Sequence, residues 1–257
     1  MFFEVVILSI VEGITEFLPV SSTGHLILVS HLFNMKKEFY EVFDIAIQFG
    51  AILAVLFLYP HYFQSRIKNV MSKETVIIGI SVFPILLVGY LLKDMIKDVL
   101  FSPVVIFWGL VVGGIGLIII DKVIPKNQGS DQKETVTIKQ AIMIGCWQCL
   151  ALWPGMSRSA MSIMGGLVSG LNRVTAASFS FIIAVPVMVV VVGYDLISAR
   201  STFSLIEYAW IGFGMAISFG VAFFTMRWFL SMVQNQGLTF FGVYRILLGG
   251  LGLIFFI

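Results

Sequence analysis

The sequence predicts an all-α polytopic membrane protein. Apolar residues make up 59% of the 257 residues, the mean hydropathy is +1.01, and charged residues make up only 12%. Most of the charges fall between apolar runs of about 18–20 residues, the length at which an α-helix crosses the hydrocarbon core of a bilayer. The formal net charge of +2 is too small to indicate nucleic-acid binding, and we expect no nucleic-acid partner.

Six apolar runs are long enough to be transmembrane helices. They lie near 43–60, 75–92, 104–121, 178–197, 205–225 and 240–257. The first eleven residues are apolar but lack a basic leader and a small-residue cleavage site, so we do not expect a removed signal peptide. The longest polar stretch, 122–139, is expected to be a loop. These features predict a single integral membrane domain over residues 1–257.

Two polar stretches that contain proline interrupt the apolar sequence. The first reads Glu12-Gly-Ile-Thr-Glu16-Phe-Leu-Pro19-Val-Ser21-Ser22-Thr23-Gly-His25, and the second reads Gln148-Cys-Leu-Ala-Leu-Trp-Pro154-Gly-Met-Ser157-Arg158-Ser159-Ala-Met-Ser162. Ionisable side chains at membrane depth cost about 2.5–3.5 kcal/mol each on insertion scales, so they need partners and usually mark a functional site. The residue before a proline avoids the helical conformation, and good N-caps follow each break. We therefore expect each stretch to form a re-entrant helical hairpin.

The two halves of the chain repeat the same order of elements. Pro154 follows Pro19 by 135 positions, and the segment that begins at Phe179 aligns with the one at Phe43 at an offset of 136. Each half, approximately 1–121 and 139–257, contains a broken helix, a short helix and three spans, with loop 122–138 between the halves. An odd number of spans inverts the second half relative to the first. The sequence thus predicts an inverted-topology repeat with a site near the membrane midplane.

The distribution of basic residues predicts the orientation in the membrane. Nine Lys and Arg residues fall on the side of loops 61–74 and 122–139, and five fall on the other side. The nine are Arg66, Lys68, Lys73, Lys122, Lys126, Lys133, Lys139, Arg173 and Arg227; the five are Lys36, Lys37, Lys93, Lys97 and Arg200. By the positive-inside rule the side with nine is cytoplasmic, and both termini then lie outside. Arg158 and Arg245 lie within apolar sequence and were not counted.

The hairpin tips have the features of an anion site. Each tip should point a helix N-terminus, with its free N–H groups and positive dipole end, toward the membrane interior, and such ends bind phosphate. Arg158 adds a planar set of donors that suits phosphate oxygens, although an arginine can also extend to a lipid headgroup. Five hydroxyls lie in the same stretches, on Ser21, Ser22, Thr23, Ser157 and Ser159. Some of them could instead bond to backbone or neighbouring helices.

A pair of carboxylates suggests a metal ion at this site. Glu12 and Glu16 are four residues apart, so both side chains project from one face of a helix. Beside a phosphate they would repel it unless a divalent cation lies between them, and oxygen ligands of this kind favour Mg²⁺ or Ca²⁺. His25 follows Ser22 by three residues, within reach to act as base or nucleophile, although a histidine here could instead serve packing alone. Either Ser22 or His25 could attack phosphorus. Carboxylates, hydroxyls, a histidine and an arginine together suit phosphoryl transfer to water.

Two further pairs of residues have open interpretations. Asp44 and Gln48, four residues apart near the outer end of a span, either support the site residues or bond neighbouring helices. Cys146 and Cys149 have the spacing of a redox or zinc pair, but no second ligand pair accompanies them. We therefore expect neither a redox function nor a zinc site.

The two polar stretches resemble the signature motifs of the undecaprenyl-diphosphate phosphatases, also called bacitracin-resistance proteins. The resemblance extends over essentially the whole chain, including Ile47-Gln-Phe-Gly-Ala-Ile-Leu-Ala-Val55. It implies hydrolysis of undecaprenyl diphosphate to undecaprenyl phosphate and inorganic phosphate, which recycles the lipid carrier of peptidoglycan synthesis and confers bacitracin resistance. It also implies a divalent-metal requirement, a location in the bacterial inner membrane and a site open to the periplasm.

The resemblance assigns roles by motif position. It implies that the functional glutamates are Glu12 and Glu16, that the functional serine and histidine are Ser22 and His25, and that Ser157 and Arg158 bind phosphate. We also expect Thr23, Ser159 and Ser162 to contact phosphate and Ser21 to support the tip. The family pattern after the arginine is usually Ser-Gly-Ala-Thr, whereas this chain has Ser159-Ala-Met-Ser162, which leaves the role of Ser162 open.

Two other functions are compatible with parts of this pattern. A transporter or flippase for an anionic lipid would use the same fold and phosphate site without a nucleophile. The phosphatidate-phosphatase superfamily performs similar chemistry, but it needs a Lys…Arg-Pro element and a histidine shortly after the Ser-Arg, and this sequence has neither. Gly109, Gly113 and the glycines in 249–252 indicate close helix packing and leave a homodimer possible.

Overall fold

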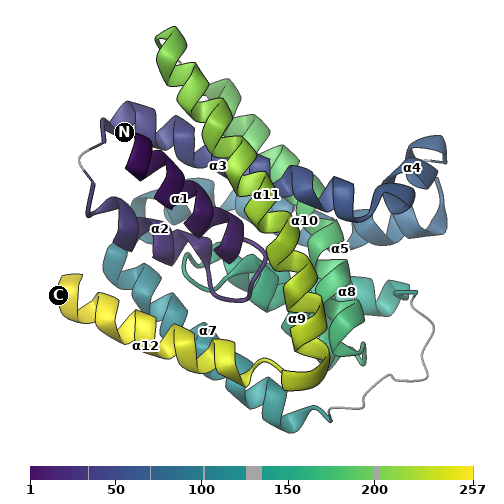
Figure 1. The fold of residues 1–257 in the computed structure, drawn as a ribbon. Coiled ribbons are helices and arrows are strands. Elements are labelled where there is room, and N and C mark those ends of the chain that lie inside the picture. Colours follow the sequence, from purple (N-terminus) through teal and green to yellow (C-terminus); the bar gives the residue numbers. More distant parts are fainter. Residues whose placement is uncertain (34, 70, 101, 126–134, 199–202, 257) are drawn as a thin grey trace.

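The computed structural model describes residues 1–257 except 34, 70, 101, 126–134, 199–202 and 257 (Figure 1). The described part of the chain is helical and contains no strand. Six helices are long and apolar enough to cross a membrane: α3 (Lys37–Leu58), α5 (Lys73–Leu91), α7 (Pro103–Val123), α10 (Arg173–Ser198), α11 (Leu205–Gln236) and α12 (Thr239–Phe256). They confirm the six predicted spans. Short elements α4 (Pro60–Lys68), α6 (Lys93–Met95) and η1 (Ile96–Leu100) connect the first three.

The ends of the long helices follow local capping rules. Ser72 and Ser102 accept backbone N–H groups at the starts of α5 and α7, and Ser204 and Glu207 form a reciprocal capping box at the start of α11. The helix α11 continues to Gln236, beyond the predicted end of the apolar run at 225. Polar side chains after 225 shorten the apolar run but leave the helix intact, and it ends only at Gly237, whose φ is 78°.

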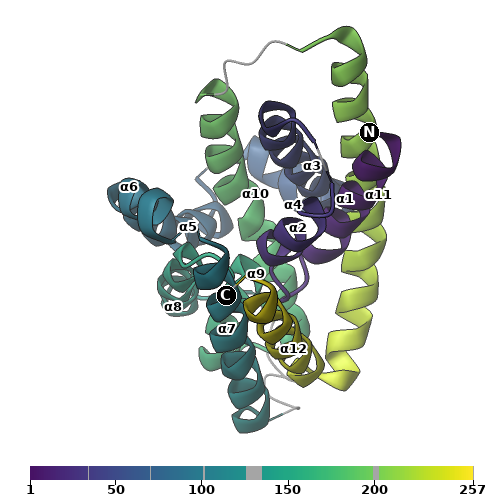
Figure 2. The same cartoon turned by 90° about the vertical axis from the view of Figure 1, so that its left-hand side faces the viewer.

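Two pairs of shorter helices complete the fold. In the first pair, α1 (Phe2–Thr15) packs against α2 (Ser22–Ser30); in the second, α8 (Ile138–Gln148) packs against α9 (Arg158–Val168). A 3₁₀ turn, η2 (Cys149–Leu152), follows α8. Figures 1 and 2 show both pairs among the long helices. The first pair packs through α1 against α11, whereas the second packs through α8 against α5, so each pair contacts the second span of the opposite half.

The core lies where these pairs meet the long helices. The ring of Phe17, just after α1, packs edge-on against Phe181 of α10 with centroids 5.4 Å apart, and Phe181 in turn contacts Phe229 of α11 at 6.1 Å. All three rings are fully buried. In contrast, large apolar side chains such as Phe83 and Phe224 are exposed on the outer faces of their helices. Such outward-facing apolar side chains are expected where helices contact lipid.

The helices α7 and α12 are held close together by glycines. A Cβ atom on Gly249 would lie 2.8 Å from the carbonyl oxygen of Phe107, and one on Gly252 would overlap the Phe107 ring. A Cβ on Gly113 would overlap the guanidinium of Arg245. This confirms the prediction that these glycines permit close helix packing, within one chain. The homodimer stays a prediction.

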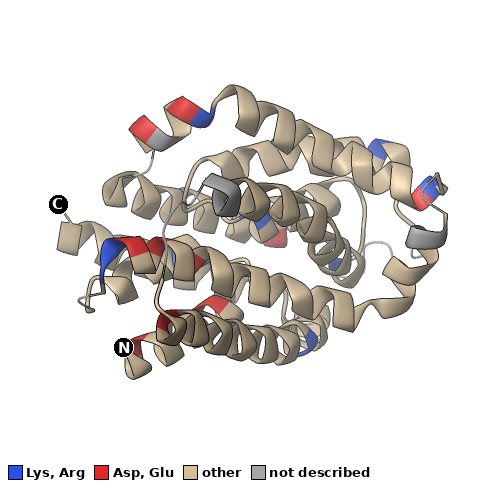
Figure 3. Cartoon of the chain, turned by 90° about the horizontal axis from the view of Figure 1, so that it is seen from above, with Lys and Arg blue, Asp and Glu red and all other residues tan. Residues whose placement is uncertain are grey.

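The positions of charged residues lie mainly toward the two ends of the long helices, and the N- and C-termini lie at the same end (Figure 3). Two charged residues, Glu12 and Arg245, are fully buried. Of the basic residues used to predict orientation, Lys126, Lys133 and Arg200 lie outside the described residues. Most of the predicted loop 122–138 lies outside them as well.

Candidate active site

The two helix pairs meet through the segments that break them. The hydroxyl of Ser159 donates a hydrogen bond of 2.7 Å to the carbonyl oxygen of Leu18. Next to this bond, Nη2 of Arg158 lies 3.3 Å from Oε1 of Glu16. Ser159 and Arg158 belong to the first turn of α9, whereas Leu18 and Glu16 follow α1. The structure therefore brings together the two polar stretches that the sequence singles out.

The residue before each second helix has an unusual backbone conformation. Ser21 precedes α2 with φ 68°, and Ser157 precedes α9 with φ 70°. They are the only non-glycine residues with positive φ in the described part of the chain. Conformations of this kind cost about 1–3 kcal/mol and persist only where surrounding contacts hold them, which is common at functional sites. Both helices start where the sequence predicts.

Ser22 and Glu16 form a hydrogen bond that pairs a hydroxyl with a carboxylate. The hydroxyl of Ser22 donates a hydrogen bond of 2.7 Å to Oε2 of Glu16, and the other oxygen of Glu16 faces Arg158. The Glu16 side chain is only 8% exposed, whereas Ser22 is partly exposed. A hydroxyl held against a carboxylate at this distance has the geometry of a nucleophile and its general base.

Arg158 has an N–H group that is available to bind an anion. Its Nη1 donates to the carbonyl oxygen of Ser180 on α10 at 3.3 Å, and its Nη2 is paired with Glu16. Its Nε is buried and has no hydrogen-bond partner among the described residues. A buried N–H group without a partner is costly unless a ligand satisfies it. An oxygen of a bound phosphate would satisfy it.

Glu12 is a fully buried carboxylate, and neither of its oxygens has a hydrogen-bond partner within the described ranges. The negative charges of Glu16 and Asp44 and the positive charge of Arg158 lie within electrostatic reach of it. A buried carboxylate near two others is unfavourable, and a bound cation would offset their repulsion.

The residues present can supply only part of a metal coordination sphere. No group of three or more His, Cys, Asp or Glu side chains in the described ranges is arranged to hold a metal ion. Two carboxylates alone would leave the other ligands of a divalent cation to substrate oxygens and water, which is common for Mg²⁺ at phosphate sites. Metal binding stays a prediction.

Both ring nitrogens of His25 have partners within hydrogen-bond distance, and its role in the reaction stays a prediction. Its Nδ1 lies 2.8 Å from the carbonyl oxygen of Ser21, and its Nε2 lies 2.7 Å from the hydroxyl of Tyr244 on α12. The imidazole stacks on the Tyr244 ring with centroids 5.5 Å apart. Both ring nitrogens are thus occupied by a carbonyl and a phenol.

The other predicted hydroxyls differ in what they contact. The Ser157 and Ser159 hydroxyls lie 3.0 Å apart, and Ser157 also accepts the backbone N–H of Ala160. Ser162 is buried, donates to the carbonyl of Arg158 and lies 2.6 Å from the hydroxyl of Ser180. Thr23 lies partly exposed in the first turn of α2. Phosphate contact by these hydroxyls stays a prediction.

The two pairs with open interpretations make local hydrogen bonds. Nε2 of Gln48 donates to Oδ2 of Asp44 at 3.2 Å within α3, and the charge of Asp44 reaches Glu12. Cys146 of α8 and Cys149 of η2 are free cysteines, and Sγ of Cys149 donates to the backbone carbonyl of Gly145 in α8.

Arg245 is a residue to which the sequence pattern assigned no role. It lies on α12, is fully buried, and donates to backbone carbonyl oxygens of α7 and of both tips. The acceptors are Leu110 at 3.3 Å, Gly109 at 3.2 Å, Pro19 at 3.2 Å and Gly155 at 2.9 Å. Its guanidinium therefore joins the two broken segments. An arginine inside an apolar span was a signal that could have identified it.

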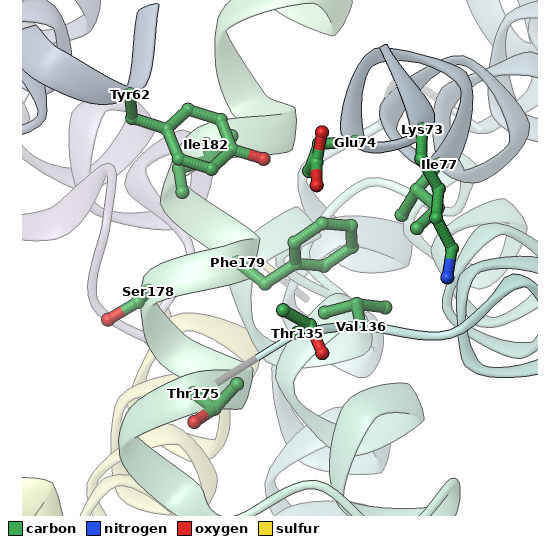
Figure 4. A pocket seen from close by; sticks show the side chains of 10 residues that line it. All are labelled: Tyr62, Lys73, Glu74, Ile77, Thr135, Val136, Thr175, Ser178, Phe179 and Ile182. Atoms are coloured by element: carbon green, nitrogen blue, oxygen red, sulfur yellow. The ribbon is translucent and has the colours of Figure 1, made fainter. Parts of the chain in front are cut away.

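A cavity of about 200 Å³ lies beside the site and not within it (Figure 4). Tyr62 of α4, Glu74 of α5 and Phe179 of α10 are among its lining residues. None of the predicted site residues lines it. Phe179 precedes Ser180, whose carbonyl accepts from Arg158, so the cavity borders the outer side of the same α10 segment.

Comparisons with known proteins identify the family of this chain. The family model described as bacitracin resistance protein BacA matches residues 5–251. An undecaprenyl-diphosphatase of Clostridium tetani is 39% identical over 257 residues, covering 98% of this chain and 95% of the relative. One of Sulfurihydrogenibium sp. is 43% identical and covers 96% of each chain. Undecaprenyl-diphosphatase 1 of Bacillus thuringiensis is 43% identical over 97% of this chain and 96% of its own.

The matched region contains both polar stretches, five of the six long helices and most of α12. The chain belongs to the bacitracin resistance protein BacA family.

Proposed function

We propose that this chain is a multi-pass enzyme of the bacterial inner membrane that hydrolyses undecaprenyl diphosphate to undecaprenyl phosphate and inorganic phosphate. The reaction recycles the lipid carrier of peptidoglycan synthesis and confers bacitracin resistance. The family membership and the names of the relatives support the reaction. The structural observation that best supports this reaction is the 2.7 Å hydrogen bond from Ser22 to Glu16, beside the guanidinium of Arg158.

These contacts suggest a two-step mechanism. Oγ of Ser22 attacks the terminal phosphorus while Glu16 takes the hydroxyl proton. The bond from that phosphorus to the bridging oxygen breaks, and undecaprenyl phosphate leaves with the proton from Glu16. In the second step Glu16 takes a proton from water, the water oxygen attacks the phosphoserine, and the proton returns to Ser22 as inorganic phosphate leaves. Arg158 holds the equatorial oxygens and stabilises their charge throughout.

Glu12 and Glu16 would hold a divalent cation, Mg²⁺ or Ca²⁺, together with oxygens of the diphosphate. When bound, it supplies positive charge that offsets the repulsion between the carboxylates and the substrate. Glu12, which has no hydrogen-bond donor among the described residues, is the better candidate for a dedicated ligand. Glu16 also bonds Ser22 and Arg158, which suits its role as base.

The proposal includes an inverted repeat with two re-entrant hairpins, a site open to the periplasm and both termini outside. The shared backbone conformation of Ser21 and Ser157 supports it, as does the exchanged packing of α1 on α11 and α8 on α5. Two cavities also occupy corresponding positions. Each lies between the second span of one half and the first span of the other: one is lined by Glu74 of α5 and Thr175 of α10, and the other by Glu207 of α11 and Phe39 of α3.

The test is phosphate release by the purified protein in detergent, where no membrane separates two compartments. We expect the wild type to release inorganic phosphate from undecaprenyl diphosphate, and Ser22→Ala and Glu16→Gln to release almost none while remaining folded. Exposed Ser65→Ala, on α4, is the matched control for loss of a serine hydroxyl and should keep full activity. A wild type that moves the lipid across vesicles but releases no phosphate in detergent would be a transporter.

A further inference from the structure

Tyr244 lies outside both polar stretches, yet its side chain reaches the first tip. It is on α12, and its ring is 38% exposed. Its hydroxyl lies 2.7 Å from Nε2 of His25, which is itself buried. The two rings stack with an interplanar angle of 14°. The contact therefore has both a polar and an apolar component.

The direction of the hydrogen bonds follows from the acceptor at one end. The carbonyl oxygen of Ser21 can only accept a hydrogen bond, so Nδ1 of His25 carries a hydrogen and donates it to this bond. In a neutral imidazole Nε2 is then an acceptor, and the hydroxyl of Tyr244 donates to it. The result is a continuous chain from the Tyr244 hydroxyl through the imidazole to the Ser21 carbonyl.

The carbonyl at the end of this chain belongs to one of the two residues with unusual backbone conformation. Ser157, its counterpart, is held by its own hydroxyl, which accepts the N–H of Ala160 at 3.2 Å. Ser21 makes no such side-chain cap among the described residues. His25 therefore supplies to the first tip the local support that Ser157 supplies to the second. Ser22, directly after Ser21, is the residue whose hydroxyl must face Glu16.

We propose that Tyr244 is a positioning residue that acts through His25 on the backbone of Ser21, and that His25 exchanges no proton with the substrate. The inference rests on the proposed function, in which Ser22 is the nucleophile. It assigns a role to a residue of α12 and separates His25 from the reacting groups. Loss of the Tyr244 hydroxyl removes one of the contacts that hold the imidazole against the Ser21 carbonyl, so the Ser22 hydroxyl spends less time against Glu16.

The test uses His25→Asn, because the amide nitrogen of asparagine can take the place of Nδ1 and donate to the Ser21 carbonyl. Asparagine has no group that titrates or attacks phosphorus. We expect His25→Asn to keep kcat within about tenfold of the wild type, and His25→Ala to lose about ten- to a hundredfold, with KM little changed in both. The low-pH limb of the kcat/KM profile should be the same in His25→Asn and the wild type.

A double-mutant cycle tests the connection to Tyr244. Tyr244→Phe should lower kcat about three- to tenfold in the wild type and have no further effect in His25→Asn, because the chain is already broken there. Tyr208→Phe removes a hydroxyl from an exposed tyrosine on α11 and is the matched control, with unchanged kcat expected. Thermal unfolding of each variant in detergent reports whether it is folded.

Two results would overturn the inference while the proposed function stands. A folded His25→Asn as inactive as Ser22→Ala would make His25 a reacting group. If Tyr244→Phe lowered kcat equally in the wild type and in His25→Asn, Tyr244 would not act through His25. Failure of the proposed function is a separate observation, because the wild type itself would then release no phosphate.

Discussion

Ser21 and Ser157 share one backbone conformation, with φ of 68° and 70°, at positions 136 residues apart (157 − 21). The residue that follows differs: Ser22 in the first tip and Arg158 in the second. Both following side chains contact the same carboxylate, that of Glu16. One backbone arrangement, used twice, thus places a hydroxyl and a guanidinium on either side of Glu16. Such a site requires both halves of the chain.

We predict from Glu12 and Glu16 that activity depends on a divalent cation. Chelation with EDTA should abolish phosphate release, and added Mg²⁺ or Ca²⁺ should restore it. Glu12→Gln should lower activity and raise the cation concentration needed for half-maximal rate. Because it removes an uncompensated buried charge, it should unfold at the same or a higher temperature than the wild type. Glu41→Gln, an exposed carboxylate on α3, is the control. Full activity in chelator would contradict the metal site.

The proposed orientation can be tested by labelling single cysteines in a chain without Cys146 and Cys149. Residues 34–40 should be external and residues 126–133 cytoplasmic. Lys36→Cys and Lys122→Cys are suitable because both lysines are exposed near these segments. A membrane-impermeant maleimide should label the first in intact spheroplasts and the second only after permeabilisation. Labelling of both from the same side would rule out the inverted repeat.

Adjacent glycines on α12 offer a matched test of close packing. A Cβ on Gly249 would lie 2.7 Å from a methyl of Val111 and 2.8 Å from the Phe107 carbonyl, whereas nothing lies within 4 Å of one on Gly250 among the described residues. Gly249→Ala should therefore lose about 1–3 kcal/mol of stability. Gly250→Ala should be neutral or slightly stabilising, because alanine favours helix. Thermal unfolding in detergent measures both, and equal midpoints would argue against the packing.

Arg245 should be essential for the assembly of the tips. Lysine keeps the charge, but one ammonium group cannot reach carbonyl oxygens on α7 and on both tips together. Each lost charge-assisted hydrogen bond costs about 1.5–3 kcal/mol, so Arg245→Lys should lower the unfolding temperature and the activity together. Arg227→Lys, on the exposed face of α11 against Phe223, should change neither. A stable, active Arg245→Lys protein would show that the tips hold together without the guanidinium.

Much of the fold could be predicted because its signals are local. Run length gives the six spans, and Pro19 and Pro154 mark the breaks in the two helix pairs. The end of α11 could not be predicted from hydropathy, because the helix continues through polar residues until Gly237. The prediction that links the two polar stretches is also correct, since Arg158 contacts Glu16.

The rest of the site depends on packing between distant segments. The partners of Arg245 are backbone carbonyls, which carry no signature in the sequence. The spacing of His25 from Ser22 predicts that the two lie near each other, but it does not indicate that Tyr244, far along the chain, contacts the imidazole. The direction in which a side chain points within its helix turn is decided by such tertiary contacts.

Arg158 provides the sharpest test of the assembled site, because it belongs to one tip and is paired with the other. If it clamps the phosphate through two donors, lysine keeps the charge but loses the planar geometry. Arg158→Lys should remain folded and lose about ten- to a hundredfold in rate, the equivalent of one charge-assisted hydrogen bond made in the transition state. Glu16→Gln should lose activity through the base and the metal, and excess cation should restore part of the metal contribution only. No cation concentration should restore Arg158→Lys. A folded Arg158→Lys enzyme with wild-type turnover would make this arginine a structural link to Glu16, and phosphate binding would then fall to the helix N-termini alone.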